Sequence, residues 1–328
     1  MFQYVITVEP LGLLYGSAGA FLSPANLVGR AGRRFPPDAP TLSGLYYNGA
    51  SEALRRELGE KLHLAGPFWA EQEDPLNFYV PIPWTRVVGE DSSDEWTIAD
   101  HHWQRTDPDL KPAYRWQPIN SWKAPLRNLQ KNQARKDPWQ FVPALHPHLK
   151  DDERCVPEQD GLFLENAAQM CPGTCLVYLA SHPLSAGWYR FGGESHVVQI
   201  GCRDLPERSK AMALLAEPID RAFALLTPGI WGSNRFSLRH PQHPDFPKPV
   251  LMLTEKPVPF RYRIAEQLGR GRYAVPAGSV YVLSQPLDQP WRDWNSDWFP
   301  REGHSYKRWG CGLALPLEIE GLQTLQGV

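Results

Sequence analysis

The stretch Gly187-Trp-Tyr-Arg-Phe-Gly-Gly-Glu-Ser-His-Val-Val-Gln-Ile200 predicts a β-hairpin. Residues 188–191 and 196–200 are rich in aromatic and β-branched side chains, and Gly192 and Gly193 lie between them. Paired glycines are typical of hairpin turns because glycine adopts a positive φ without steric penalty. Without Cβ atoms the turn would also let a ligand approach the backbone, and Arg190 lies next to it. The pattern fits either an ordinary hairpin or a turn that binds an anion.

Two further glycine-rich stretches, Val275–Tyr281 and Trp309–Leu313, lie between apolar runs later in the chain. A glycine-bearing loop near the N-terminus contains Arg30, Arg33 and Arg34 and no acidic residue. Backbone N–H groups in such turns can bind phosphates, and neighbouring aromatic residues can stack on bases. This combination favours single-stranded RNA as a ligand.

The chain has 328 residues, 42% hydrophobic and 21% charged, which fits one large globular domain or two of ordinary size. Its formal net charge of −2 means that contact with nucleic acid must depend on a local patch. The five cysteines, an odd number, predict reduced thiols in a cytoplasmic protein. The N-terminal residues lack the features of a signal peptide, and no apolar run is long enough for a membrane span.

Hydrophobic periodicity predicts two helices, each set among several strands. The helices are expected at residues 42–62 and 206–226, the second ending before Thr227-Pro-Gly229. Strands are expected at residues 2–10, around Phe68, and at 78–83, 162–164, 175–180, 188–191, 196–200, 250–253, 275–283 and 311–317. This order predicts an α+β fold of two ferredoxin-like (RRM-like) domains with long loop insertions. The first is expected at 1–160, with an insertion at about 86–160, and the second at 161–328.

The insertion begins with an acidic segment, residues 89–110, which predicts an exposed loop. Residues 111–136 contain seven basic residues and no acid. Lys123, Arg127, Lys131 and Arg135 recur every fourth residue, so a helix would align them on one face. Such a face could contact phosphates, or it could simply be solvated.

Metal and nucleotide motifs are weak or missing. The chain lacks the Gly-x4-Gly-Lys-Ser/Thr phosphate loop and the Gly-x-Ser-x-Gly hydrolase motif. Cys171 and Cys175, with His146 and His148 upstream, have loose spacing for zinc, and Cys175 lies in an expected strand. We therefore predict no metal and no cofactor.

The histidines suggest little catalysis. Only His101, His102 and His196 have surroundings that hint at acid–base chemistry, and a histidine beside a glycine turn is more often structural. No pair of carboxylates has a diagnostic spacing. We predict that the chain is a binding protein and not an enzyme.

Several motifs occur in one order along almost the whole chain. They are the N-terminal strand with the arginine-bearing loop, Phe35-Pro-Pro, Pro40-Thr-Leu-Ser-Gly44, Gly161-Leu-Phe, Phe191-Gly-Gly-Glu194, Leu226-Thr-Pro-Gly229, Val275-Pro-Ala-Gly-Ser-Val-Tyr281 and Gly310-Cys-Gly-Leu-Ala-Leu315. In this order they resemble the RAMP (repeat-associated mysterious protein) superfamily. Within it, the chain is most similar to the subunit that holds the 5′ end of the guide RNA in type III-B CRISPR (Cmr) effector complexes, with the type III-D equivalent as an alternative.

The resemblance implies two ferredoxin-like domains and no nuclease activity of the subunit itself. The implied partners are the crRNA through its 5′ handle, the large polymerase-like subunit and the backbone RAMP subunits, with target RNA reached indirectly and no membrane. Contacts carried over by motif involve Arg30, Arg33, Arg34, Arg190, Gly192, Gly193, Gly278 and Ser279, and the basic segment adds Lys123, Arg127 and Lys131. Gly-Gly-Glu is followed here by Ser-His, where related sequences often have more basic residues.

Two other classes of function stay open from the residues. The first is an endoribonuclease of the same superfamily that processes CRISPR repeat RNA, with His196 or His102 as general base. The second is a tryptophan-rich carbohydrate-binding protein, which the lack of a secretion signal and of paired cysteines disfavours.

Overall fold

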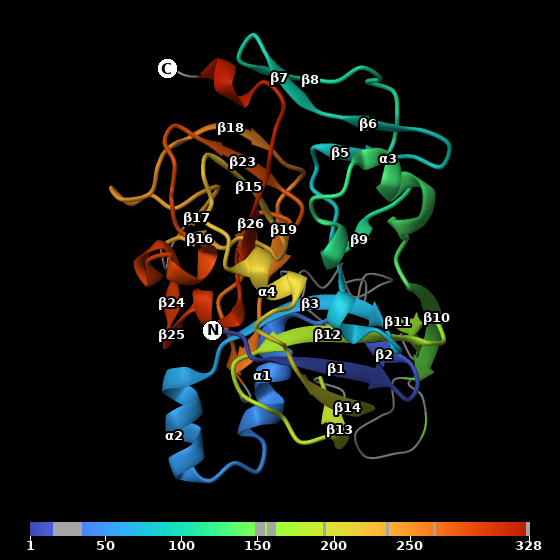
Figure 1. The fold of residues 1–328 in the computed structure, drawn as a ribbon. Helices are drawn as coiled ribbons and strands as arrows, with labels where there is room; N and C mark the ends of the chain where they lie inside the picture. Colours follow the sequence, from blue (N-terminus) through green and yellow to red (C-terminus); the bar gives the residue numbers. More distant parts are fainter. Residues whose placement is uncertain are drawn as a thin grey trace.

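A computed structural model describes residues 1–15, 35–147, 155, 162–192, 195–233, 236–264 and 267–325 (Figure 1). The fold is mixed α/β, with antiparallel sheets and few helices. The largest sheet has seven strands in the order β13-β14-β1-β12-β3-β4-β9. Their bounds are β1 Tyr4–Pro10, β3 Leu64–Glu71, β4 Tyr79–Pro81, β9 Trp116–Pro118, β12 Thr174–Ala180, β13 Gly187–Phe191 and β14 His196–Asp204.

The centre of this sheet is buried on both faces. Every residue of β12 is buried, and Val5, Ile6 and Val8 of β1 are inaccessible to solvent. The helix α1 (Ala39–Tyr47) contacts β3 and β13, and the Tyr178 hydroxyl donates to the Pro37 carbonyl just before α1, at 2.6 Å. These contacts confirm the expected N-terminal strand and the strand at 175–180.

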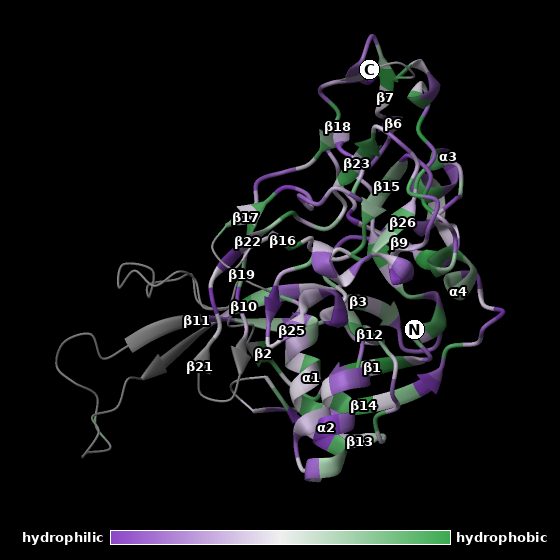
Figure 2. Cartoon of the chain, turned by 90° about the vertical axis from the view of Figure 1, so that its left-hand side faces the viewer, coloured by the Kyte–Doolittle hydropathy of each residue, from purple (hydrophilic) through white to green (hydrophobic). Residues whose placement is uncertain are grey.

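The single helix expected at 42–62 is instead two helices. α1 ends at Tyr47, and α2 spans Glu52–Lys61. Gly49 between them has a φ of +72°, a left-handed conformation that interrupts a helix. In Figure 2, α2 is mostly hydrophilic, and Leu58 is the one residue of this helix that is buried.

The second sheet has four strands in the order β18-β23-β15-β26. Their bounds are β15 Ala222–Leu225, β18 Pro249–Leu253, β23 Val280–Leu283 and β26 Ala314–Pro316. The helix expected at 206–226 was therefore wrong over most of its length: α4 covers only Lys210–Leu215, and the segment 222–225 is a strand buried at all four positions. A short apolar run can be a buried strand as readily as a buried helix, and Pro218 blocks continuation of α4.

The remaining described strands form smaller ladders. β2 (Leu14–Tyr15), β10 (Trp139–Pro147) and β11 (Leu162–Met170) make a three-stranded sheet. Two-stranded ladders are β5 (Arg86–Val88) with β6 (Ser93–Glu95), β7 (Thr97–Ala99) with β8 (His102–Gln104), β16 (Trp231–Gly232) with β17 (Ser237–Leu238), β19 (Val258–Phe260) with β22 (Arg272–Ala274), β20 (Arg263–Ile264) with β21 (Gln267–Leu268), and β24 (Arg301–Glu302) with β25 (His304–Ser305). The segment 89–110, expected as a loop, thus contains three short strands.

The segment after β4 is bound to the second sheet. Trp84 N–H donates to the Gly278 carbonyl, Ile98 N–H to the Glu320 carbonyl and Trp122 Nε1 to the Pro316 carbonyl, each at 2.9 Å. The seven-stranded sheet, in turn, joins strands from both sides of residue 160. The division at residue 160 stays a prediction, although a boundary there would separate strands that are hydrogen bonded to each other.

Candidate nucleic-acid interface

The hairpin predicted at 187–200 is present at the edge of the seven-stranded sheet. β13 and β14 pair antiparallel, with Phe191 opposite His196 at the closed end. Gly192 has a φ of +76°, and its carbonyl accepts a hydrogen bond from the Ser195 N–H at 3.2 Å. Gly192 is exposed, and a Cβ on it would meet nothing within 4 Å. Gly193 lies outside the described residues.

One face of this hairpin is open to solvent. Arg190 is exposed, and Trp188, two residues earlier on the same face, is 75% exposed. Val197, the cross-strand partner of Arg190, is also exposed. Phe191 and Tyr189 occupy the alternate, less exposed positions. Trp188 was not among the predicted site residues, although its spacing of two from Arg190 in a strand places both on one face.

The loop arginines Arg30, Arg33 and Arg34 lie outside the described residues. The described chain resumes at Phe35, whose side chain lines a cleft of about 1080 Å³. The rings along this cleft are in mutual contact: Phe35 lies 5.1 Å from Trp139, and Trp139 lies 5.9 Å from Trp116, as measured between ring centroids. The cleft is therefore suited to flat or apolar groups.

Charge in this cleft is close to balanced. Its lining includes four basic residues and four acidic ones, namely Arg86, Arg105, Lys111, Arg115, Asp38, Asp109, Asp137 and Glu255. Some of these are committed to contacts within the protein: Arg86 pairs with Glu95 at 3.3 Å, and the Arg105 guanidinium lies 4.9 Å from the Trp96 ring centroid. A phosphate would gain little attraction from a cleft of this composition.

The turn at Gly278 and Ser279 is internal. Ser279 is fully buried, and its hydroxyl lies 2.7 Å from that of Thr254. Gly278 has a φ of +85°, and a Cβ there would lie 3.1 Å from the Trp84 indole nitrogen. The turn thus holds the segment after β4 against the second sheet. Its contact with RNA stays a prediction, and its position among the described residues offers no support for it.

The basic segment 111–136 is not the continuous helix expected. Helical structure is confined to three short pieces, η3 (Ile119–Ser121), α3 (Leu126–Asn128) and the following η4 (Leu129–Gln133), so Lys123 and Arg135 lie outside it. Pro125 just before α3 explains the late start, since the residue before a proline disfavours helical φ and ψ.

The basic residues of this segment are also partly paired. Lys123 bonds Glu217 at 2.5 Å, and Lys136 bonds Glu90 at 2.8 Å. Arg127 is exposed, and the backbone of Lys131 lies in η4. Lys123 and Arg135 therefore do not share one helical face with Arg127.

Among the described residues, no three His, Cys, Asp or Glu side chains gather as they would around a metal. Burial raises the pKa of the Cys175 thiol to about 12, so it is protonated at neutral pH and a poor metal ligand. His101 has a φ of +63° and, with Asp100, forms the turn between β7 and β8. Within the described chain, no helix is both long and apolar enough to cross a membrane.

A family model described as CRISPR-associated protein (Cas_Cmr3) matches residues 13–319. No curated protein matches the chain. Among solved structures, a chain of the type III-B Cmr-beta complex bound to cognate target RNA is 11% identical, with a TM-score of 0.49 and coverage of 85% of this chain and 86% of that one. A chain of the Csm3–Csm4 subcomplex of the type III-A CRISPR-Cas interference complex is 10% identical, with a TM-score of 0.42 and coverage of 87% and 94%.

Proposed function

The chain belongs to the Cas_Cmr3 family of CRISPR-associated proteins, and from this membership we propose that it is a guide-RNA-binding subunit of a type III CRISPR effector complex. In this proposal it grips the 5′ handle of the crRNA, caps the backbone of RAMP subunits next to the large polymerase-like subunit, and cleaves no RNA itself. The match of the family model to residues 13–319 is the observation that carries the proposal. The proposed location is the cytoplasm.

The pairing order of the strands supports a duplicated ferredoxin-like fold. In the larger sheet, β12 lies between β1 and β3, and β14 pairs with the other edge of β1. In the smaller sheet, β23 lies between β18 and β15, and β26 pairs with the other edge of β15. Both arrangements insert one antiparallel strand between two strands that run in the same direction, as in the split β-α-β unit of ferredoxin-like folds.

The exposed hairpin turn is the proposed handle contact with the best support. Arg190 offers a guanidinium fork suited to phosphate, and Gly192 leaves the backbone open to a ligand. The arginine-bearing loop is proposed as the second contact, on the basis of its sequence alone. The endoribonuclease hypothesis gains no support from the described geometry, in which His102 belongs to a short exposed hairpin.

Replacing Arg190 by alanine is expected to weaken binding of the purified chain to a guide RNA about tenfold, because a charge-assisted bond to phosphate is lost. The slope of log affinity against log salt concentration should also become shallower by about 0.7, since one fewer phosphate is contacted and its counterion is no longer released. Fluorescence anisotropy over a salt series measures both quantities.

Arg56→Ala is the matched control for this experiment. Arg56 is exposed on α2 and pairs only with Glu52 of its own helix among the contacts described, at 3.1 Å, so its replacement removes the same charge elsewhere. Equal losses for the two variants would show that net charge alone matters.

RNA that co-purifies with the chain and shares one repeat-derived 5′ end would support the handle role, whereas guides without a common 5′ end would contradict it.

A further inference from the structure

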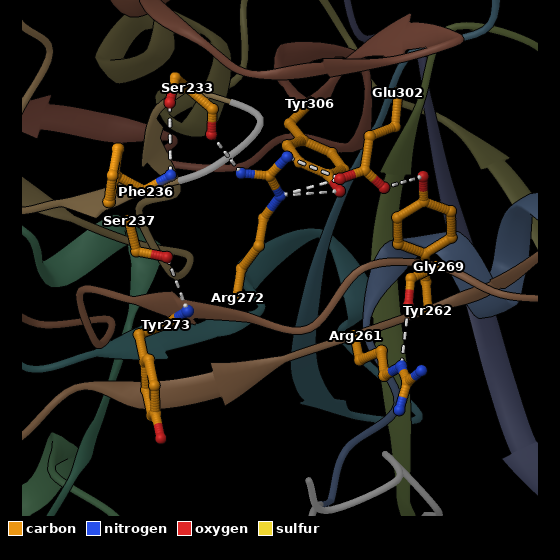
Figure 3. A network of polar contacts seen from close by, with 10 residues as sticks. All are labelled: Ser233, Phe236, Ser237, Arg261, Tyr262, Gly269, Arg272, Tyr273, Glu302 and Tyr306. Carbon is orange, nitrogen blue, oxygen red and sulfur yellow. Dashed lines mark hydrogen bonds and ion pairs between the residues drawn. The ribbon is translucent and has the colours of Figure 1, made fainter.

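Two aromatic side chains outside the β13–β14 hairpin are exposed. Phe236 is 68% exposed and Tyr273 is 52% exposed. Phe236 immediately precedes β17, and Tyr273 is the central residue of β22. The two segments are joined by a hydrogen bond from the Tyr273 N–H to Ser237 Oγ, at 3.0 Å (Figure 3). Exposed aromatic rings on neighbouring segments are the usual elements of a stacking surface.

A buried cation holds this surface in place. The Arg272 side chain is 2% exposed and makes an ion pair with Glu302 at 2.6 Å. Its Nη1 donates to the Ser233 carbonyl at 2.8 Å, and Ser233 Oγ accepts from the Phe236 N–H at 3.3 Å. Figure 3 shows Arg272 between the segment that carries Phe236 and Glu302 of β24. The backbone on both sides of the rings is thus anchored to one buried group.

Alternation along β22 turns the tyrosine outward. Arg272 and Ala274 are buried, so Tyr273 between them points to the opposite side of the strand. Its cross-strand partner on β19 is Pro259, which is also exposed. A tyrosine has only two side-chain torsions to fix, so ordering this outward-facing ring on binding costs little conformational entropy.

The segment that contains both rings is basic. Residues 236–274 include seven basic residues and three acidic ones, a net charge of +4. Since the whole chain carries −2, the other residues together carry −6. Arg239 and Arg270 are exposed, and Arg261, which directly follows β19, is half-buried and donates from Nε to the Gly269 carbonyl at 2.8 Å. Arg272 is neutralised by Glu302, which lies outside this segment, so an excess of +3 remains to complement a polyanion.

We propose that Phe236 and Tyr273 form a stacking surface for unpaired bases of single-stranded RNA, with the arginines around them near its phosphates. The inference rests on the proposed function for its ligand but concerns a different part of the chain from the Arg190 hairpin. Stacking on aromatic faces tolerates any base, so this surface would add affinity without reading sequence.

The test uses the full chain and a short single-stranded RNA in which 2-aminopurine replaces adenine. The fluorescence of 2-aminopurine falls when it stacks on an aromatic ring. Phe236→Leu and Tyr273→Leu should each lower affinity roughly five- to hundredfold and reduce the quenching, because base–aromatic stacking is lost. Tyr273→Phe should bind as the wild type does, since it keeps the ring. Leu54→Ala, at an exposed apolar position on α2, is the control for loss of apolar surface.

The outcomes separate this inference from the proposed function. Wild-type affinity and quenching in both leucine variants, with binding still weakened by Arg190→Ala, would overturn the stacking surface and leave the guide-binding role intact. Leucine variants that bind RNA normally but lose a protein partner would also overturn it, in favour of a protein interface. Wild-type chain that binds no RNA would remove both proposals.

Discussion

The Gly310→Ala variant is expected to be about 2–5 kcal/mol less stable than the wild type. Gly310 ends the 3₁₀ helix η7 (Tyr306–Trp309) with a φ of +65°, a conformation that costs an alanine about 1–2 kcal/mol. A Cβ at this position would also lie 2.5 Å from Ala65 Cα and 2.7 Å from the Leu64 carbonyl oxygen. Backbone atoms of β3 cannot yield as a flexible side chain could. Urea denaturation followed by tryptophan fluorescence measures the change.

Gly303→Ala separates the two causes of this loss. Gly303 has a φ of +78°, but a Cβ there would meet nothing within 4 Å. We expect this variant to lose only the conformational part, about 1–2 kcal/mol. Equal destabilisation by the two substitutions would contradict close packing of Gly310 on β3.

Gly310 lies where the chain after η7 meets the seven-stranded sheet. The Thr227 hydroxyl donates to the Gly310 carbonyl and accepts from the Leu313 N–H at 2.9 Å, while η7 contacts β3. The sequence indicated this stretch as one of three glycine-rich turns suited to phosphate. A positive-φ glycine has the same local pattern whether its open side meets a ligand or another strand, so sequence could not distinguish the two.

The elements that sequence predicted well are those whose pattern is visible within a few neighbouring residues. The hairpin at 187–200 and the strand at 2–10 depend on alternation and turn residues, which are properties of neighbouring positions. The helix prediction was wrong at 222–225 because Ala-Phe-Ala-Leu is apolar at every position, so it shows no alternation of polar and apolar residues that would mark a strand. The pairing of β1 with β12 could not be read from the sequence, because the two strands are separated by more than 160 residues.

The candidate site residues likewise divide into those marked by a local sequence motif and those brought together only by the fold. Arg190 was identified because it adjoins a turn signal, and it is exposed as a ligand contact requires. Phe236 and Tyr273 were missed, since a lone aromatic residue in an irregular segment does not reveal its exposure. Their segments are joined by the Ser237 contact and by Arg272, whose partner Glu302 is 30 residues away in sequence.

Replacing Arg272 by leucine is expected to cost about 3–5 kcal/mol, because Glu302 would remain partly buried without its cation. The matched control is Arg301→Leu, which removes the neighbouring ion pair between Arg301 and Asp297. Both side chains of this pair are 62% exposed. Exposed pairs contribute about 0–1 kcal/mol, so this control should be close to the wild type. Arg272→Leu combined with Glu302→Leu should recover much of the loss, because the unpaired buried charge is then removed. A double variant no more stable than the single one would contradict this account.

The effect of Arg272→Leu should also depend on pH. Burial raises the pKa of Glu302, but hydrogen bonds from Arg272, Tyr262 and Tyr306 outweigh it and leave the pKa below its ordinary value. A carboxyl group whose pKa is lower in the folded state stabilises the fold above its unfolded pKa, and this stabilisation is lost as pH falls through the folded pKa. The difference in unfolding free energy between wild type and variant should therefore be largest at neutral pH and shrink on acidification, first as the unpaired Glu302 of the variant takes up a proton and then below about 4.3, where the wild type loses its own contribution. A difference that stays constant down to the acid transition would show that packing of the arginine stem, and not the ion pair, anchors the strands beneath Phe236 and Tyr273.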